Sequence, residues 1–216
     1  MTVADAVVLA GGTASRMGGV NKPALLVGGR SLLDRVLDAL RGAIDGSLIV
    51  VGPVPSPILG AVEHGPASHD RPVVWVQEAQ PGGGPLPALA AGLDEVQSAL
   101  MVAMASDLPF VTPADVDALV RALDRSNADV AGAVVVDPAG RRQWLFSAWR
   151  TDALREAVLR RDRLPDRPLA EVLGQLRTVP VTVGVDTSRP PPWLDCDTAS
   201  DLARARQVDR DAGPRH

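Results

Sequence analysis

Short apolar segments alternate with longer helix-forming segments along most of this chain, and this alternation is the feature that most constrains its fold. The apolar segments are rich in Val, Ile and Ala, as strands buried on both faces of a sheet are. We expect strands at 6–10, 48–52, 73–77, 100–105, 130–136, 143–148 and 178–183. We expect helices at 31–41, 85–99, 113–125, 151–161, 168–176 and 198–208. The pattern predicts a mostly parallel sheet with helices on both faces.

The expected architecture is α/β, a single three-layer α/β/α domain of Rossmann-like form. The alternation is less regular after Asp137, so we expect a small antiparallel excursion there. Thr112 before Pro113 is typical of a helix start, and Ser31 and Thr151 could cap helices in the same way. The domain is expected to span residues 1–208, and the charged residues 209–216 to form a disordered tail.

Charge and cysteine content exclude several classes of protein. The net charge of −4 gives no electrostatic footprint for nucleic acid. The single cysteine, Cys196, excludes an internal disulfide and a multi-cysteine metal site, and a packed thiol is the favoured interpretation. No signal peptide and no apolar run of the roughly 20 residues that a membrane span needs is found. We therefore expect a soluble cytoplasmic protein without nucleic-acid or membrane partners.

The segment 9–22, LAGGTASRMGGVNK, follows the first expected strand directly. Its loop therefore opens at the carboxyl edge of the sheet, where α/β proteins bind their ligands. Gly11 and Gly12 let backbone N–H groups approach a phosphate, and Arg16 and Lys22 add positive charge for the same anion. The segment matches neither a Walker A loop nor a dinucleotide fingerprint. It predicts a site for an anion such as a nucleoside triphosphate.

Two later segments end at the same edge of the expected sheet. Residues 81–86, PGGGPL, follow the third strand and open a helix, so the backbone there could lie close to a flat ligand. Asp107 follows the very apolar strand 100–105. Mg²⁺ binds one or two carboxylates together with phosphate oxygens and water, so Asp107 is a candidate ligand. The alternative for Asp107 is a helix cap.

The Leu-Ala-Gly-Gly, Arg and Lys-Pro elements of residues 9–23 resemble the signature of the molybdenum-cofactor nucleotidyltransferases, above all the guanylyltransferases. More broadly they are similar to nucleotide-sugar pyrophosphorylases. The further segments follow in the family's order, so the resemblance covers nearly the whole chain. It implies that a phosphate of molybdopterin attacks the α-phosphorus of GTP, that pyrophosphate leaves, and that Mg²⁺ assists. It also implies molybdenum-cofactor enzymes or chaperones as partners.

The resemblance implies a set of site residues as well. The catalytic residues would be Arg16, Lys22 and Asp107. The remaining nucleotide contacts would come from Leu9, Ala10, Gly11, Gly12, Glu78, Gly84, Pro85 and Leu86. In this set the Leu9 backbone and the Gly84-Pro85 turn would contact the base. A surface role for Glu78 is the alternative.

The chain departs from the guanylyltransferase pattern near its end. Asp195-Cys196-Asp197-Thr198 stands where those enzymes usually carry Asn-x-Asn-Thr, and cytidylyltransferases more often carry Asp-x-Asp-Thr. Asp197 could complete a metal site with Asp107 or could cap the last helix. Asp195 and Gln143 could face the acceptor, although a bend residue is the alternative for Gln143.

The sequence alone is also compatible with other functions. A cytidylyltransferase or a sugar-1-phosphate nucleotidyltransferase would use the same scaffold. The Asp195–Asp197 pattern is compatible with a cytidylyltransferase. A non-catalytic nucleotide-binding module is the alternative of a different class. It would be expected to have lost Lys22 or Asp107, and both are present.

Overall fold

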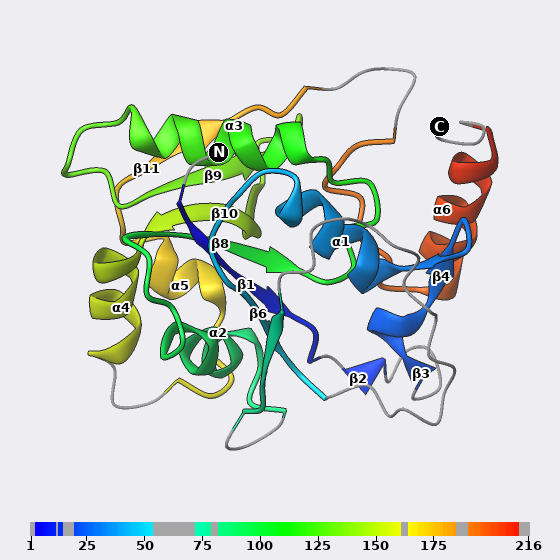
Figure 1. Cartoon of the computed structure of the whole chain (residues 1–216), viewed down its shortest axis with the longest axis horizontal. Helices are drawn as coiled ribbons and strands as arrows, with labels where there is room; N and C mark the ends of the chain where they lie inside the picture. The colour runs from blue at the N-terminus through cyan, green and yellow to red at the C-terminus, as the bar shows by residue number, and fades with distance from the viewer. Residues whose placement is uncertain are drawn as a thin grey trace.

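The computed structural model describes residues 3–11, 13–14, 20–53, 72–78, 82–160, 164–184 and 190–211. Seven described strands form one sheet in the order β11-β9-β10-β8-β1-β6-β7 (Figure 1). Their bounds are β1 Asp5–Leu9, β6 Leu48–Val51, β7 Val73–Val76, β8 Leu100–Ala105, β9 Gly132–Val136, β10 Arg142–Arg150 and β11 Thr178–Val181.

Only β10 runs against the other strands of this described sheet. β1 pairs in parallel with β6 and β8, β6 with β7, and β11 with β9. β10 is antiparallel to both of its neighbours, β8 and β9. The predicted α/β class, the mostly parallel sheet and the antiparallel excursion after Asp137 are confirmed.

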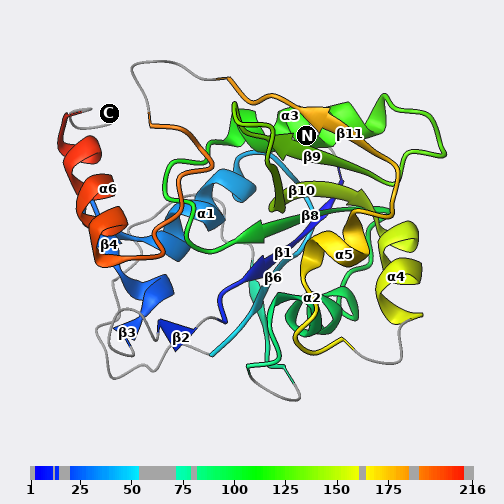
Figure 2. The same ribbon diagram turned by 180° about the vertical axis from the view of Figure 1, so that it is seen from behind.

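Helices cover both faces of the sheet, as Figures 1 and 2 show. The helices α1, Leu32–Arg41, and α3, Pro113–Asp124, pack on one face. The helices α2, Pro85–Leu93, α4, Thr151–Leu159, and α5, Leu169–Leu173, pack on the other. Within β1 the side chains of Ala6 and Val8 join the first core, and those of Val7 and Leu9 join the second. This two-sided burial explains why the strand sequences are almost wholly apolar.

A third, smaller core lies outside the main sheet, where α6, Ala199–Asp211, and the hairpin of β4, Leu26–Val27, and β5, Arg30–Ser31, lie beside α1 (Figure 1). It joins α6 to this hairpin. A second short hairpin, β2 with β3 (Thr13–Ala14 with Val20–Asn21), precedes the 3-10 turn Lys22–Ala24. Neither hairpin is predicted by the pattern of apolar residues.

Two of the three predicted helix caps are confirmed. The Ser31 side chain accepts from Asp34 N, and Thr112 forms a reciprocal capping box with Asp115. The cap predicted at Thr151 is wrong, because Thr151 is already the first helical residue of α4. Its hydroxyl instead donates to the Ser98 carbonyl at 2.7 Å and ties α4 to the start of β8.

The helix predicted at 85–99 is wrong in its length, because α2 ends at Leu93. The Asp5 carboxylate, on a residue only 3% exposed, accepts hydrogen bonds from the backbone N–H groups of Gln97 and Ser98 at 2.7 and 2.8 Å. The N–H groups of Gln97 and Ser98 therefore bind the start of β1 and do not form a further turn of α2. Asp5 also accepts from Ser47 N at 2.7 Å, so one carboxylate fastens three segments at the amino edge of the sheet.

Helix α6 continues to Asp211, so residues 209–211, which the sequence assigns to the tail, are helical. Asp209 forms an ion pair with Arg35 of α1, and this contact holds the last turns of the helix against the domain. Residues 212–216 lie outside the described residues. Across the described ranges, no helix combines the length and the apolar character that crossing a bilayer requires.

Candidate active site

The carboxyl ends of β1, β6 and β8 lie side by side in the sheet, with Leu9 opposite both Val51 and Ala105. The arrowheads of β1 and β8 point toward the side of the molecule where β3, β4 and α6 lie (Figure 1). The backbone continues this register beyond the strands, because Ala10 N donates to Val51 O and Ser106 N donates to Leu9 O, at 2.8 and 3.1 Å. The glycine loop and the Asp107 turn therefore start from the same edge, as predicted.

Lys22 lies between two carboxylates that are far apart in the sequence. Its Nζ donates to Asp107 Oδ2 and to Asp197 Oδ1, at 2.5 Å each. The side chains of Lys22 and Asp107 are 13% and 15% exposed, whereas that of Asp197 is 55% exposed. Lys22 is also the only lysine in the sequence, among 22 lysines and arginines. The predicted site residues Lys22, Asp107 and Asp197 thus come together as one cluster, which we call the Lys22 cluster.

The chain around Asp197 shows that this residue does not cap the last helix. Thr198 caps α6, because its hydroxyl accepts from Asp201 N at 3.2 Å and Asp201 Oδ2 accepts from Thr198 N at 2.8 Å. Cys196 is fully buried in the third core, which fixes the loop from inside. The Asp197 carboxylate is therefore left to bind Lys22, and the packed thiol predicted at Cys196 is confirmed.

Among the described residues around the Lys22 cluster, negative charge exceeds positive charge. Burial works to lower the pKa of Lys22, but the charges and hydrogen bonds of Asp107 and Asp197 raise it above its usual value. Partial burial raises the pKa of Asp195, and the charges of Asp197 and Asp107 raise it further. Burial and then the Asp107 charge raise the pKa of Cys196 to about 12. A cation or a hydrogen-bond donor would be stabilised here, and the Cys196 thiol stays protonated at neutral pH.

Gly11 and Glu78 meet across the edge of the sheet. A Cβ atom at position 11 would lie 3.0 Å from Glu78 Oε1, so glycine is what allows this approach. The other oxygen, Glu78 Oε2, is buried and has no hydrogen-bond partner among the residues that the structure describes. Burial raises the pKa of this carboxyl above its ordinary value. A buried carboxyl oxygen without a hydrogen-bond partner favours a ligand that brings N–H donors.

The predicted base-binding turn opens helix α2. Gly84 is its N-cap and Pro85 its first residue, as the sequence predicts. The Leu86 side chain is fully buried in the core, so its predicted ligand contact could come only from its backbone. Asp166 N donates to Gly83 O at 2.9 Å, so the segment before α5 supports this turn.

Gln143 has the contacts of a hairpin residue. Its amide nitrogen donates to Asp137 Oδ2 at 3.2 Å, and Asp137 also accepts from the backbone of Ala139 and Arg141 at the turn between β9 and β10. No described contact joins Gln143 to the Lys22 cluster. Of the two alternatives, these contacts favour the bend residue over the acceptor ligand.

Two predicted site residues lie outside the described part of the chain, and one residue near the site was not predicted. Gly12 and Arg16 lie outside the described residues. Arg35, which contacts segments next to each member of the Lys22 cluster, carries no sequence signal that would have identified it. Its neighbours become apparent only when hairpin β4–β5 and α6 pack on α1.

The donor set of the Lys22 cluster fits a magnesium ion. Two carboxylate oxygens each lie 2.5 Å from one ammonium nitrogen, so they are no more than about 5 Å apart. Mg²⁺ takes one or two carboxylates and completes its shell with phosphate oxygens and water. Within the ranges that the structure describes, no group of three or more His, Cys, Asp or Glu side chains offers a fuller metal site. The cluster therefore suits a metal that arrives with a phosphate ligand.

Comparison with known proteins gives a consistent result. The family model described as MobA-like NTP transferase domain matches residues 6–179. A molybdenum cofactor guanylyltransferase of Rhodopseudomonas palustris (strain HaA2) is 32% identical over 210 residues, which cover 93% of this chain and 89% of the relative.

Solved structures share the fold. Molybdopterin-guanine dinucleotide biosynthesis protein A from Archaeoglobus fulgidus superposes with a TM-score of 0.69 at 19% identity, over 94% of this chain and 97% of that one. A protein from Mycobacterium sp. strain JC1 superposes with a TM-score of 0.69 at 26% identity, over 96% and 97%.

Proposed function

We propose that this chain, which belongs to the family of MobA-like NTP transferase domains, transfers GMP from GTP to the terminal phosphate of molybdopterin. In this reaction an acceptor phosphate oxygen bonds to the α-phosphorus of GTP, the bond to the β-phosphate oxygen breaks, and pyrophosphate leaves. The family assignment makes the chain a nucleotidyltransferase. The observation that carries the proposal is the Lys22 cluster at the carboxyl edge of β1 and β8.

Transfer of this kind needs positioning and charge neutralisation more than covalent help from the protein. The Lys22 ammonium lies on a flexible stem, so it can turn from the carboxylates to the phosphates of a bound nucleotide. Asp107 and Asp197 would hold Mg²⁺, which when bound neutralises charge on the phosphate oxygens. The backbone N–H groups of Gly11 and Gly12 and the side chain of Arg16 would bind the same phosphates.

Glu78 supports guanine as the base. The Watson–Crick edge of guanine carries two adjacent N–H donors, whereas that of cytosine carries one donor beside an acceptor. A carboxylate accepts two such donors side by side, and within the described part of the chain one oxygen of Glu78 has no partner. Glu78 would read this edge of the base while the Gly84-Pro85 turn lies against its face. The same geometry gives cytosine only one of the two bonds.

Pyrophosphate release tests the proposal directly. We would compare GTP and CTP, each with and without molybdopterin, for the wild type, Asp107→Asn and Asp117→Asn. Asp117 is the matched control, because it is a carboxylate on α3 paired with Arg121 and lies outside the Lys22 cluster. We expect release with GTP and molybdopterin only, a loss of about 100-fold or more in Asp107→Asn, and no change in Asp117→Asn.

The other outcomes separate the alternatives. Release with CTP in place of GTP would make the chain a cytidylyltransferase. Turnover with a sugar phosphate as acceptor, and none with molybdopterin, would move it to the sugar nucleotidyltransferases. Binding of GTP without turnover under any condition would favour a non-catalytic nucleotide-binding module. Because GTP is the proposed donor, we place the reaction in the cytoplasm.

A further inference from the structure

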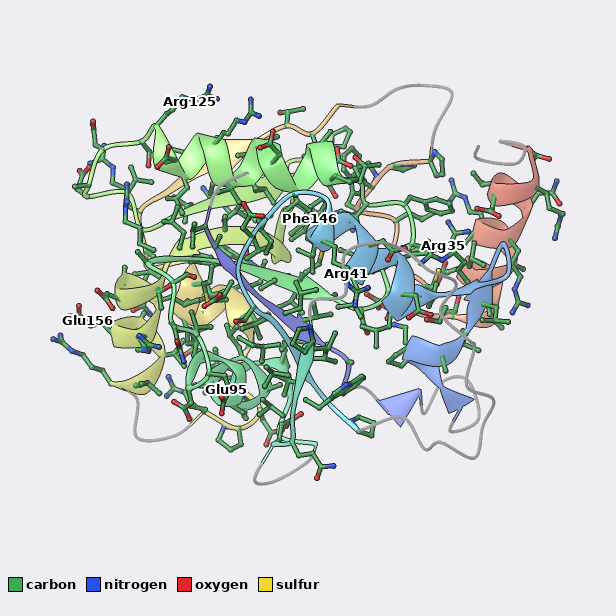
Figure 3. The ribbon with its side chains drawn as sticks, in the orientation of Figure 1. Arg35, Arg41, Glu95, Arg125, Phe146 and Glu156 are labelled. Carbon is green, nitrogen blue, oxygen red and sulfur yellow. The ribbon has the colours of Figure 1, made fainter. Side chains whose placement is uncertain are left out.

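Arg35 lies at the meeting point of three segments. It is on α1, and Figure 3 shows it between α1 and α6. Its side chain, which carries a charged guanidinium, is only 11% exposed. A charge this buried needs several acceptors around it.

The acceptors of Arg35 come from the segments that carry the Lys22 cluster. Nε and Nη2 donate to Val27 O, at 2.9 and 2.6 Å, in the hairpin that follows Lys22. Nη1 donates to Pro109 O at 3.5 Å, two residues after Asp107. Nη2 donates to Asp209 Oδ1 at 2.7 Å, on the helix that begins just after Asp197. One side chain thus ties together the three pieces of chain that supply the site.

The hairpin is shaped to reach this guanidinium. Gly28, in the turn of β4–β5, has a positive φ of 59°, a conformation that residues with a Cβ rarely adopt. A Cβ there would lie 2.0 Å from Asp209 Oδ2 and 2.5 Å from Arg35 Nη2. The close approach of hairpin, helix and arginine is therefore built into the backbone, and a larger residue at 28 would push them apart.

We infer that Arg35 is a positioning residue that sets the placement of Lys22, Asp107 and Asp197 relative to one another. The inference rests on the proposed function of this cluster. Among the described hydrogen bonds and ion pairs, Arg35 contacts none of Lys22, Asp107 and Asp197, so it acts through the segments that carry them. An arginine suits this role because its planar fork donates in several fixed directions at once, which a lysine or a glutamine does not do.

The test uses Lys22 as a reporter, since it is the chain's only lysine. In protein labelled with ¹³C-lysine, its side chain gives one set of signals whose position depends on the two carboxylates beside it. In Arg35→Gln we expect these signals to move at least half of the way to those of Asp107→Asn. We also expect kcat for GMP transfer to fall about tenfold, with the KM for GTP changed less than about threefold.

Arg150 provides a matched control. Like Arg35, it donates from one guanidinium to acceptors on three residues, here the backbone carbonyls of Val130, Leu123 and Ser126, at 3.0, 3.4 and 3.3 Å. It lies at the end of β10 opposite Leu100, at the other edge of the sheet. Arg150→Gln should lower the melting temperature as Arg35→Gln does but leave the Lys22 signals in place. Both variants keep Lys22 as the only lysine.

The outcomes are decisive in either direction. Unchanged Lys22 signals in Arg35→Gln, or an equal movement in Arg150→Gln, would overturn the inference. If Arg35→Gln does not fold, Asp209→Asn, which keeps both contacts with Val27, is judged by the same signals. The spectra are recorded without nucleotide or acceptor, so they test the role of Arg35 even if the transfer assay shows that the proposed reaction is wrong.

Discussion

Replacement of Lys22 by methionine should have opposite effects on metal binding and on catalysis. Methionine keeps much of the length and apolar stem of lysine but removes its charge. In the free protein the ammonium binds the same two oxygens that we propose for the metal, Asp107 Oδ2 and Asp197 Oδ1. Lys22 therefore competes with a divalent cation until a nucleotide draws it away. Without Lys22 we expect tighter metal binding by the nucleotide-free chain and weaker transfer activity.

The size of the effect follows from the exposure of the partners. A charge-assisted hydrogen bond between groups as buried as Lys22 and Asp107 contributes about 1.5–3 kcal/mol. The bond to Asp197, whose side chain is 55% exposed, is screened by water and adds about 0–1 kcal/mol. Loss of a competitor worth about 2 kcal/mol corresponds to roughly 30-fold tighter binding of the cation.

Titration with Mn²⁺ in the absence of nucleotide, followed by electron paramagnetic resonance, measures this affinity. Lys22→Arg is the control, because it keeps a positive charge beside the carboxylates and should bind Mn²⁺ no more tightly than the wild type does. Pyrophosphate release is measured on the same preparations, and Lys22→Met should lose about 100-fold or more. Unchanged or weaker Mn²⁺ binding in Lys22→Met would refute the idea that lysine and metal share these oxygens.

Three further predictions concern other parts of the chain. Burial raises the pKa of the Asp5 carboxyl, but hydrogen bonds from backbone N–H groups outweigh burial and hold the pKa below its ordinary value of 3.8. The contribution of this carboxylate to the stability of the fold is therefore complete above pH 3.8 and is lost as the pH falls through the lowered pKa. Asp5→Asn should therefore cost about 2 kcal/mol at neutral pH and flatten the acid side of the stability curve measured by urea unfolding. Gly11→Ala would crowd Glu78 Oε1 and should weaken GTP binding about tenfold in calorimetry, with unfolding little changed. Native Cys196, fully buried with its pKa raised to about 12, should resist iodoacetamide at pH 8 and react readily in urea; rapid native labelling would contradict its placement.

Local pattern was enough to predict the architecture. Strand β8 at Leu100–Ala105 and helix α3 after Thr112 lie where the sequence predicts them, because burial and capping leave local traces in the sequence. The end of α2 at Leu93 could not be predicted in this way. It depends on Asp5, which lies more than ninety residues away from the donors that it takes at Gln97 and Ser98.

The same division applies to the site. Gly11, Lys22 and Asp107 are predictable because they lie in the segments that follow β1 and β8, two strands that end at the same edge of the sheet. The role of Asp197 was undecided in the sequence, since a carboxylate before a helix is typical both of a cap and of a ligand. The structure decides against the cap because Thr198 occupies that position. Arg35 left no trace in the sequence, because its partners are mostly backbone carbonyls and any residue type supplies those.

The single antiparallel strand has a consequence for how such a chain can diversify. Because β10 is antiparallel to its neighbours, it begins at the edge of the sheet where the nucleotide is proposed to bind. The connection from β9 to β10 at this edge is therefore a short hairpin, whereas the parallel strands are joined by crossover connections. A hairpin loop can lengthen or shorten by single residues without moving the helices that cover the sheet. We expect the loop at 137–141 to vary in length among relatives, while the segments that carry the Lys22 cluster keep their length. Insertions and deletions in that one loop would then reshape this edge of the sheet while the segments that carry the Lys22 cluster stay in place.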